Sequence, residues 1–261
     1  PPGVLTTDAR GVIADPNVDV IIELIGGTGI AKTLVIETLK SGKPVVTANK
    51  ALLAKHGAEI FAAAKEGKAD IYYEASVAGG IPIIKALREG LAANHIQAIF
   101  GILNGTCNYI LTRMEREGLP FDTILQDAQR LGYAEADPSL DIDGFDTAHK
   151  TTILAALAYG EWFGMDAIHV EGIRGIDLQD IRYAAAAGYR IKLLGIIKLT
   201  GADIEMRVHP ALIPVKSMMA SVGEVFNAIM VRGDVVGDTL FYGRGAGMDA
   251  TASAVVADLV D

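Results

Sequence analysis

The stretch VDVIIELIGGTGIAKTLVIETLKSGKPVVT, residues 18–47, decides the fold. Its first part, residues 18–25, ends in the apolar run VIIELI, interrupted by one glutamate, which is typical of a strand buried on both faces of a sheet. A turn at Gly26-Gly27-Thr28 follows, then a predicted helix over residues 30–39 and a second predicted strand over residues 44–47. Strand, helix and strand at this spacing predict a parallel βαβ unit.

The same alternation continues beyond this stretch. Asn49 can cap a helix that runs to residue 64, and residues 71–73 form a third predicted strand. This pattern is typical of a doubly wound nucleotide-binding sheet, which normally opens with a strand that leads into a G-x-G-x-x-G turn. Residues 1–17 contain no such turn, and the chain begins with Pro1 instead of Met. We therefore expect the phosphate-binding turn to lie upstream, in a longer protein.

The pattern changes from about residue 80, where longer predicted helices stand beside a second group of predicted strands. The predicted helices cover residues 82–92, 108–117, 121–131 and 146–163, and the predicted strands cover residues 95–103, 191–199, 204–208 and 227–242. Segregated helices and strands indicate an α+β domain. The predicted fold class is therefore α/β, with a partial Rossmann-type parallel sheet followed by an α+β domain.

Composition excludes several classes of protein. The chain has 261 residues, of which 51% are hydrophobic, enough for a folded core. Its longest apolar runs are shorter than the roughly 18 residues that span a bilayer, and its start, Pro1-Pro2-Gly3, does not resemble a targeting segment. A net charge of −9 without a basic block argues against a nucleic-acid partner. We expect a cytoplasmic protein that binds neither membrane nor nucleic acid, in which the single Cys107 is a small buried side chain.

Two glycine-rich stretches resemble nucleotide-binding motifs incompletely. IGGTGIAKT, residues 25–33, follows a strand and opens a helix as a P-loop does, but Ala31 replaces the second required glycine. Its amides at residues 27–29 can still contact an anion at a helix start. Gly245-Ala246-Gly247 imitates the dinucleotide fingerprint without the second strand that this motif requires. Either stretch can equally be a plain turn.

The most informative stretch is GYAEADPSLDIDGFDTAHK, residues 132–150, a loop with five acidic residues before a helix start. Asp146 and Lys150 lie one helical turn apart, on one face. Such a pair is either an ordinary surface ion pair or a catalytic acid with the partner that orients it. The acidic loop lacks the spacing of an EF-hand, so calcium ligation of that type is not expected.

Five ordered segments together resemble homoserine dehydrogenase. These segments are VTANKALLA (46–54), EASVAGGIPII (74–84), GILNGTCNYIL (101–111), GYAEADPSLDIDGFDTAHK (132–150) and GRGAG (243–247). The chain departs from the family in lacking the front of the nucleotide domain and a regulatory domain, and in having Asp249 where a proline is expected. The resemblance implies reversible NADH- or NADPH-dependent reduction of L-aspartate 4-semialdehyde to L-homoserine, a step towards threonine, methionine and isoleucine.

The resemblance also implies roles for individual side chains. Lys150 would be the proton donor, Asp146 would hold the site together, and Glu135 would bind the amino group of the substrate. A nearby ammonium suits this chemistry, because hydride transfer to an aldehyde carbon builds negative charge on the oxygen. Lys50 would act on the cofactor side of the catalytic site, at the carboxyl edge of the parallel sheet, where open α/β folds bind ligands.

Cofactor and cation sites are implied in the same way. Gly132, Gly247 and Thr28 would approach NAD or NADP, and the residue that selects between the two would lie in the missing front part. Glu74 and the carbonyls of Val77, Gly79 and Ile81 match the family's site for a monovalent cation, usually sodium. Hard oxygen ligands of this kind suit such a cation, although a bent strand whose carbonyls bind water is the alternative.

Two domains and an oligomer complete the expectation. Residues 1–75, rejoined by residues 247–261, would form the NAD(P)-binding part, and residues 76–246 would bind substrate, catalyse and dimerise. The strands of residues 204–242 would form the interface of a homodimer or higher homo-oligomer, which would cover an otherwise exposed sheet edge. Two alternatives stay open: a truncated homologue that has lost cofactor binding, and a P-loop-like enzyme that binds nucleoside triphosphates.

Overall fold

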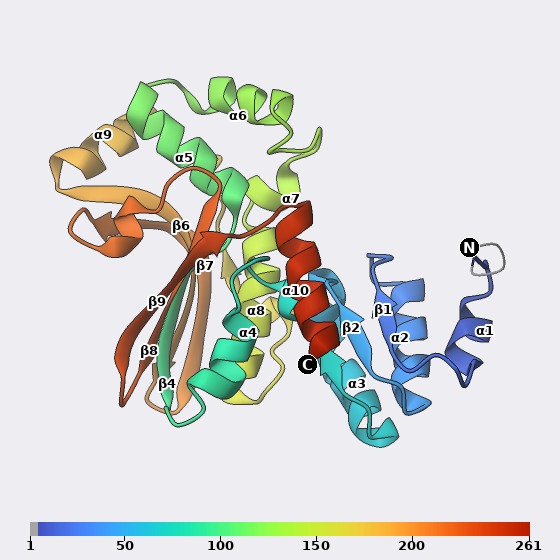
Figure 1. The fold of residues 1–261 in the computed structure, drawn as a ribbon. Helices are drawn as coiled ribbons and strands as arrows, with labels where there is room; N and C mark the ends of the chain where they lie inside the picture. The colour runs from blue at the N-terminus through green and yellow to red at the C-terminus, as the bar shows by residue number, and fades with distance from the viewer. Residues whose placement is uncertain (1–4) are drawn as a thin grey trace.

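The computed structural model of the protein describes residues 5–261; the first four residues of the predicted nucleotide-binding part lie outside the described residues. Its first unit is a three-stranded sheet in the order β1 (Ile21–Glu23), β2 (Val45–Thr47), β3 (Ile71–Tyr72), and both pairings are parallel. The crossovers are α2 (Ile30–Lys40) and α3 (Lys50–Gly67), which pack on each other (Figure 1). The predicted parallel βαβ arrangement is confirmed.

The predicted burial of the first strand is wrong. β1 is shorter than the apolar run, and three apolar side chains in or beside it, Ile22, Leu24 and Ile25, are 42%, 65% and 60% exposed, respectively. The reason is its place in the sheet, because within residues 5–261 β1 pairs with β2 alone. Glu23, which interrupts the apolar run, is buried instead.

The predicted cap of α3 is confirmed. The Oδ1 atom of Asn49 accepts the backbone N–H of Leu52 at 3.1 Å, and the helix ends at Gly67, before Lys68, which has a positive φ of 54°. A short helix that the sequence did not predict, α1 (Ala9–Ala14), packs on α2. Capping by Asn49 matters for function because it fixes Lys50 as the first residue of α3, directly after β2.

The second unit contains a six-stranded sheet in the order β5-β7-β6-β4-β8-β9, in which only the β5–β7 pairing is parallel. The strands are β4 (Ile96–Ile102), β5 (His169–Val170), β6 (Tyr189–Thr200), β7 (Asp203–Pro214), β8 (Phe226–Gly233) and β9 (Gly237–Arg244). The predicted second sheet is confirmed. The two-residue β5 was not predicted, and β7 extends six residues beyond the predicted end at residue 208.

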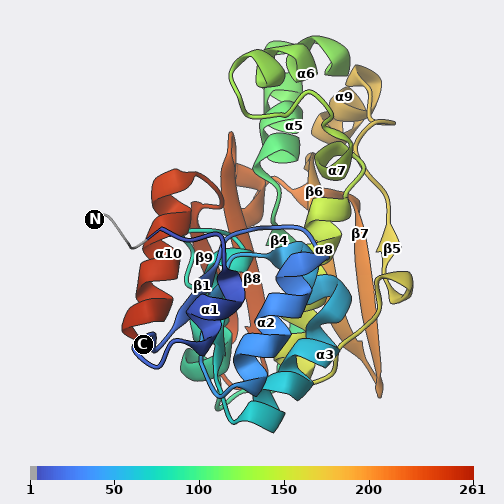
Figure 2. The ribbon, with the colours of Figure 1, turned by 90° about the vertical axis from the view of Figure 1, so that its right-hand side faces the viewer.

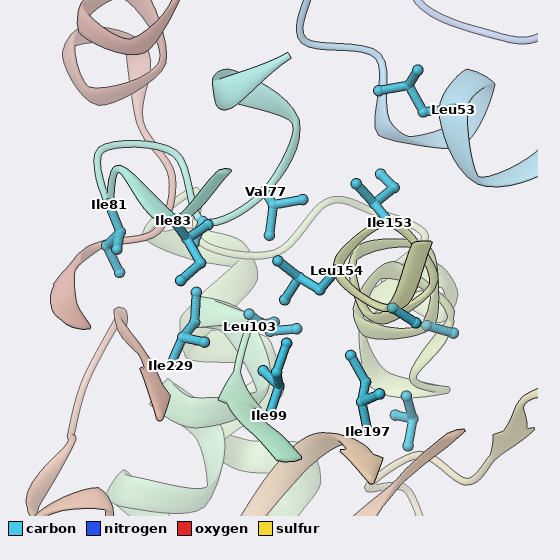
Figure 3. Close-up of a cluster of buried hydrophobic side chains, with 14 of the residues drawn as sticks. Leu53, Val77, Ile81, Ile83, Ile99, Leu103, Ile153, Leu154, Ile197 and Ile229 are labelled. Atoms are coloured by element: carbon cyan, nitrogen blue, oxygen red, sulfur yellow. The ribbon is translucent and has the colours of Figure 1, made fainter. Parts of the chain in front are cut away.

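Helices cover one face of this sheet and the end of it that lies at the top of Figure 1. They are α4 (Ile83–Lys85) with a π-helical continuation (Ala86–Gly90), α5 (Gly105–Glu117), α6 (Phe121–Arg130), α7 (Ser139–Ile142), α8 (Phe145–Tyr159) and α9 (Leu178–Ala186), with 3-10 turns at Glu74–Ser76, Met165–Ala167 and Met218–Ser221. α8 packs against β4, β6 and β7. The core lies between them, where Leu154 of α8 points towards Leu103, Ile99 and Ile197 (Figure 3). α8 ends four residues earlier than predicted, since Gly160 takes a positive φ of 75°.

The last helix, α10 (Met248–Val260), joins the two units. It packs against β2 and the turn Glu74–Ser76, and lies between the two sheets in Figure 1. Its Asp258 accepts the backbone N–H of Glu74 at 2.8 Å. α3 meanwhile packs against α8, and Figure 2 shows α2 and α3 in front of α8. These contacts bring the start of α3 to the start of α8. Within residues 5–261, no helix is both long and apolar enough to cross a membrane.

Candidate active site

Asp146, in the first turn of α8, is the centre of the site. Its Oδ2 atom accepts hydrogen bonds from Lys150 Nζ at 2.7 Å and from Asn104 Nδ2 at 2.9 Å, and its Oδ1 atom lies 3.2 Å from Lys50 Nζ. Asp146 is 4% exposed and Lys150 is 8% exposed. The interpretation of Asp146 and Lys150 as a surface pair is therefore wrong. Two lysines that are distant in sequence share one buried carboxylate.

Lys50, Asn104 and Asp146 each lie at the start of a helix. Lys50 is the first residue of α3, Asn104 caps α5 by accepting the N–H of Cys107 at 2.8 Å, and Asp146 follows Gly144 at the start of α8. Gly144 has a φ of +89°, a conformation that favours glycine. The start of α8 carries partial positive charge, which stabilises the carboxylate of Asp146 in its first turn.

The charges around Asp146 outweigh its burial. Burial alone raises the pKa of this carboxyl, but the ammonium groups of Lys150 and Lys50 and the hydrogen bonds from Lys150 and Asn104 hold the pKa well below its ordinary value. The carboxylate is therefore ionised at neutral pH. Lys150 Nζ also donates to the carbonyl of Leu103 at 2.7 Å. These two acceptors fix the position of the ammonium group and leave its third N–H for another oxygen.

Sequence reasoning missed Asn104 and Asp141. Asn104 Nδ2 donates to Asp141 Oδ1 at 2.7 Å as well as to Asp146, so one amide links both carboxylates. Thr106 Oγ1 donates to the second oxygen of Asp141 at 3.1 Å. Burial and the nearby negative charge of Asp146 raise the pKa of Asp141. The available signal was the position of Asn104 as a helix cap in the segment GILNGTCNYIL.

The other predicted substrate and cofactor residues lie on three further segments. Glu135 is exposed, after α6, and its backbone carbonyl accepts Gln129 Nε2 at 3.1 Å. Gly132 and Gly247 both have positive φ, of 76° and 116°, and a Cβ atom at either would meet nothing within 4 Å. No hydrogen bond or ion pair found among the described residues joins Glu135 to the cluster around Asp146. The role of Glu135 in binding the substrate and those of Gly132 and Gly247 in binding the cofactor stay predictions.

Thr28 lies in the turn after β1, and this turn is connected to Lys50. Asn49 Nδ2 donates to the carbonyl of Gly27 at 2.8 Å, and Asn49 directly precedes Lys50. Thr28 and Lys50, both predicted on the cofactor side, are thus brought to neighbouring loops at the carboxyl ends of β1 and β2. Ligands of open α/β sheets bind at such an edge.

The predicted cation ligands belong to a tightly packed turn before α4. The carboxylate of Glu74 accepts the backbone N–H groups of Ile84 and Lys85 at 2.8 Å each, and the carbonyl of Ile81 accepts that of Ile83 at 2.8 Å. Burial raises the pKa of Glu74. A Cβ atom on Gly79 would lie 2.8 Å from the carbonyl oxygen of Gly245, so two glycine loops pack backbone to backbone here.

Family models match both units of the chain. One described as "Homoserine dehydrogenase" matches residues 82–260, and one described as "Homoserine dehydrogenase, NAD binding domain" matches residues 1–74. The chain belongs to the homoserine dehydrogenase family. The stretch 25–33 falls within the NAD-binding match, and no observation favours the nucleoside triphosphate alternative. The family assignment and the α/β fold expected from the sequence are confirmed.

Individual relatives agree with the family models. The homoserine dehydrogenase of Neisseria gonorrhoeae is 54% identical over 261 residues, which cover 100% of this chain and 60% of the relative. That of Pseudomonas aeruginosa is 54% identical over 257 residues, covering 98% and 59%, respectively. The chain thus spans about 60% of the length of these curated relatives.

Solved structures of the family have the same fold. A homoserine dehydrogenase from Thiobacillus denitrificans, 55% identical, superposes with a TM-score of 0.96 over 98% of this chain and 59% of its own. A hyperthermophilic archaeal homoserine dehydrogenase in complex with NADPH, 29% identical, superposes with a TM-score of 0.85 over 98% of this chain and 75% of its own.

Proposed function

We propose that this chain carries the catalytic part of a homoserine dehydrogenase, which reversibly reduces L-aspartate 4-semialdehyde to L-homoserine with NADH or NADPH. The observation that carries the proposal is the shared carboxylate: Asp146 is buried and contacts Lys150 and Lys50 at 2.7 and 3.2 Å. Membership of the family supplies the substrate. The proposed biosynthetic role and cytoplasmic location depend on the same family membership.

Lys150 would supply the proton. When bound, the nicotinamide cofactor supplies the hydride to the aldehyde carbon, and the negative charge that develops on the oxygen needs a nearby acid. The ammonium of Lys150 is oriented by Asp146 and by the carbonyl of Leu103, and its remaining N–H can point at the substrate oxygen. Proton transfer to that oxygen leaves a neutral amine, which solvent protons restore. Lys50 would stabilise the same charge from the cofactor side.

The remaining assignments concern binding. Glu135 is exposed and anionic, which suits contact with the amino group of the substrate. Thr28, Lys50, Gly132 and Gly247 would line the cofactor, and the two glycines leave open space where a side chain would stand. The archaeal relative binds NADPH. NADH and NADPH differ at the ribose 2′ position, so both belong in the test.

A monovalent cation, sodium in the resemblance, would be held by Glu74 and by the carbonyls of Val77, Gly79 and Ile81. The donor set fits, because a buried carboxylate whose pKa is raised by burial gains from a neighbouring cation. The ion would hold the turn before α4 and take no part in the chemistry. An unfolding midpoint that is the same in sodium chloride and in choline chloride would argue against this site.

We also propose a homodimer formed through the six-stranded sheet. The sheet face opposite α8 carries apolar side chains that are only partly buried, including Phe100, Ile213 and Met230, packed on a second buried apolar cluster. A broad apolar face of this kind is typical of a subunit interface. Sedimentation of a monomer at micromolar concentration would contradict the dimer.

The decisive assay is L-homoserine-dependent reduction of NAD⁺ and of NADP⁺ by the full natural chain, run beside its Lys150→Ala variant. We expect turnover with at least one cofactor and a loss of about 100-fold or more in kcat in the variant, since general acid catalysis commonly supplies about 10²–10⁴. A folded, full-length parent that is silent with both cofactors would support the non-catalytic homologue instead.

A further inference from the structure

Glu23 is a buried acid that the proposed mechanism does not use. It interrupts the apolar run of β1 and is 4% exposed. Its Oε1 atom accepts the backbone N–H groups of Ile25 and Gly26 at 2.8 and 3.0 Å. These bonds hold the start of a turn in which Gly26 and Gly27 have φ of 78° and 70°. The carboxylate therefore determines the shape of the glycine turn.

The second oxygen of Glu23 is bonded to the next strand. Glu23 Oε2 accepts the hydroxyl of Thr47 at 2.7 Å, and Thr47 Oγ1 in turn accepts the backbone N–H of Asn49 at 3.0 Å. Asn49 Nδ2 donates back to the carbonyl of Gly27 at 2.8 Å. Together with the bond from Gly26 to Glu23 and the backbone from Gly26 to Gly27, these hydrogen bonds form a closed ring between the loops that follow β1 and β2.

This ring ends at the candidate active site. Asn49 also caps α3 through Leu52, which fixes Lys50 as the first helical residue, and Lys50 Nζ lies 3.2 Å from Asp146. The partners of Glu23 are N–H and O–H groups at the carboxyl edge of the parallel sheet, not cations. A carboxylate in this role orients donors in two loops at once, which an apolar strand residue cannot do.

We propose that Glu23 and Thr47 are positioning residues that couple the glycine turn 25–29 to Lys50. The inference rests on the proposed function, because the turn and Lys50 are both assigned to the cofactor side of the dehydrogenase site. The hydroxyl of Thr47 joins Glu23 to the backbone of Asn49, beside the direct bond from Asn49 to Gly27. Its loss leaves the bonds from Glu23 to the turn in place and leaves the Asn49–Gly27 bond as the remaining hydrogen bond of this ring between the turn and α3.

Matched variants test this link. Thr47→Val removes the hydroxyl with little change of shape, whereas Thr47→Ser keeps the hydroxyl. In the cofactor-free protein we expect amide hydrogen exchange at Ile25 and Gly26 to accelerate about tenfold in Thr47→Val but not in Thr47→Ser. The dissociation constants of NADH and NADPH, measured by fluorescence, should rise about tenfold in the same variant only. Glu23→Gln should produce both changes more strongly.

A double-mutant cycle with Lys50→Ala separates positioning from general stability. Thr47→Val should also lower kcat about tenfold, and if Thr47 acts through Lys50 this fall should disappear when Lys50 is alanine. Additive losses, or equal exchange rates in the valine and serine variants, would overturn the proposal. An inactive parent would instead overturn the proposed function, and the exchange measurement on the cofactor-free protein would still decide whether Thr47 links the two loops.

Discussion

Asn104, which caps α5, and Asn108, one turn later, belong to two clusters that each contain a buried lysine, and the two lysines differ in their hydrogen-bond partners. Asn104 contacts Asp146, which pairs with Lys150 and Lys50. Asn108 accepts Lys192 Nζ at 2.9 Å. The other acceptors of Lys192 are the carbonyl of Val222 at 2.6 Å and Thr112 Oγ1 at 3.3 Å. Lys150 therefore has a carboxylate among its hydrogen-bond acceptors, and those of Lys192 are neutral oxygens.

This difference in acceptors distinguishes Lys150, in the candidate active site, from Lys192, which links segments of the fold. Burial lowers the pKa of Lys192 to about 8. Lys192 and Asn108 tie the segment before β8 to α5, since Asn108 Nδ2 also donates to the carbonyls of Glu224 and Phe226. In the other cluster, two ammonium groups keep the carboxylate of Asp146 charged, beside loops that we propose bind the cofactor. The ammonium group of Lys150 has two acceptors and one N–H left for a substrate, which suits catalysis. The ammonium group of Lys192 has three acceptors, which suits holding segments together.

Among the substitutions that test the difference between the two clusters, Asp146→Asn should have the largest effect. The substitution keeps the shape but leaves two ammonium groups without a counter-charge, so we expect kcat to fall about 100-fold or more and the free energy of unfolding to fall by about 3 kcal/mol. Urea unfolding at fixed protein concentration and initial rates check both. Asp122→Asn, an exposed acid in α6, is the control.

The pH dependence of the same variant follows from the lowered pKa of Asp146. Because the folded pKa lies below the unfolded value of about 3.9, the contribution of the ionised carboxylate is complete above about pH 4 and is lost as pH falls towards the folded value. The difference in unfolding free energy between parent and variant should therefore shrink in acid. A difference that is constant from pH 7 down to the acid transition would contradict this role.

Lys192→Met should change stability at alkaline pH. The folded pKa of about 8 lies below the ordinary value of 10.5, so between these pH values the unfolded chain binds more protons. The free energy of unfolding of the parent should rise across that range by about 3 kcal/mol relative to the variant. Urea unfolding at pH 8 and pH 10.5 checks this, with the exposed Lys216→Met as control. Parallel curves for parent and Lys192→Met would refute it.

The smallest effects should come from the two asparagines. Asn104→Ala removes a helix cap and the bonds to Asp141 and Asp146, so kcat should fall about tenfold. Asn108→Ala should lower the free energy of unfolding by about 1–2 kcal/mol and leave kcat within about threefold of the parent. Paired rate and unfolding measurements distinguish the two. The reverse pattern would mean that the clusters have been assigned the wrong roles.

Local features of the fold could be predicted from the sequence. The βαβ alternation, the Asn49 cap and the one-turn spacing of Asp146 and Lys150 depend on neighbours in the chain, and the structure has all three. The exposure of β1 could not be predicted, because an apolar run does not reveal whether its strand lies at the edge of a sheet.

The assembly of the site depended on contacts between distant segments. Lys50 was assigned through the resemblance and its place after a predicted strand, and its contact with Asp146 requires α3 to pack on α8. Asp141 looked like one more acid of a solvated loop until its link to Asn104 placed it beside Asp146. The burial of Asp146 and Lys150 was hidden because α8 is enclosed nearly all round, without the polar face that surface helices have.

The same substitution at both buried lysines tests the central claim most directly. We would measure kcat with L-homoserine, and the free energy of unfolding, for Lys150→Met and Lys192→Met in the full natural chain. The account predicts that Lys150→Met loses about 100-fold or more in kcat, whereas Lys192→Met stays within about threefold of the parent and loses its alkaline stability profile. Equal losses of kcat in the two variants, or a Lys150→Met variant that turns over like the parent, would contradict it.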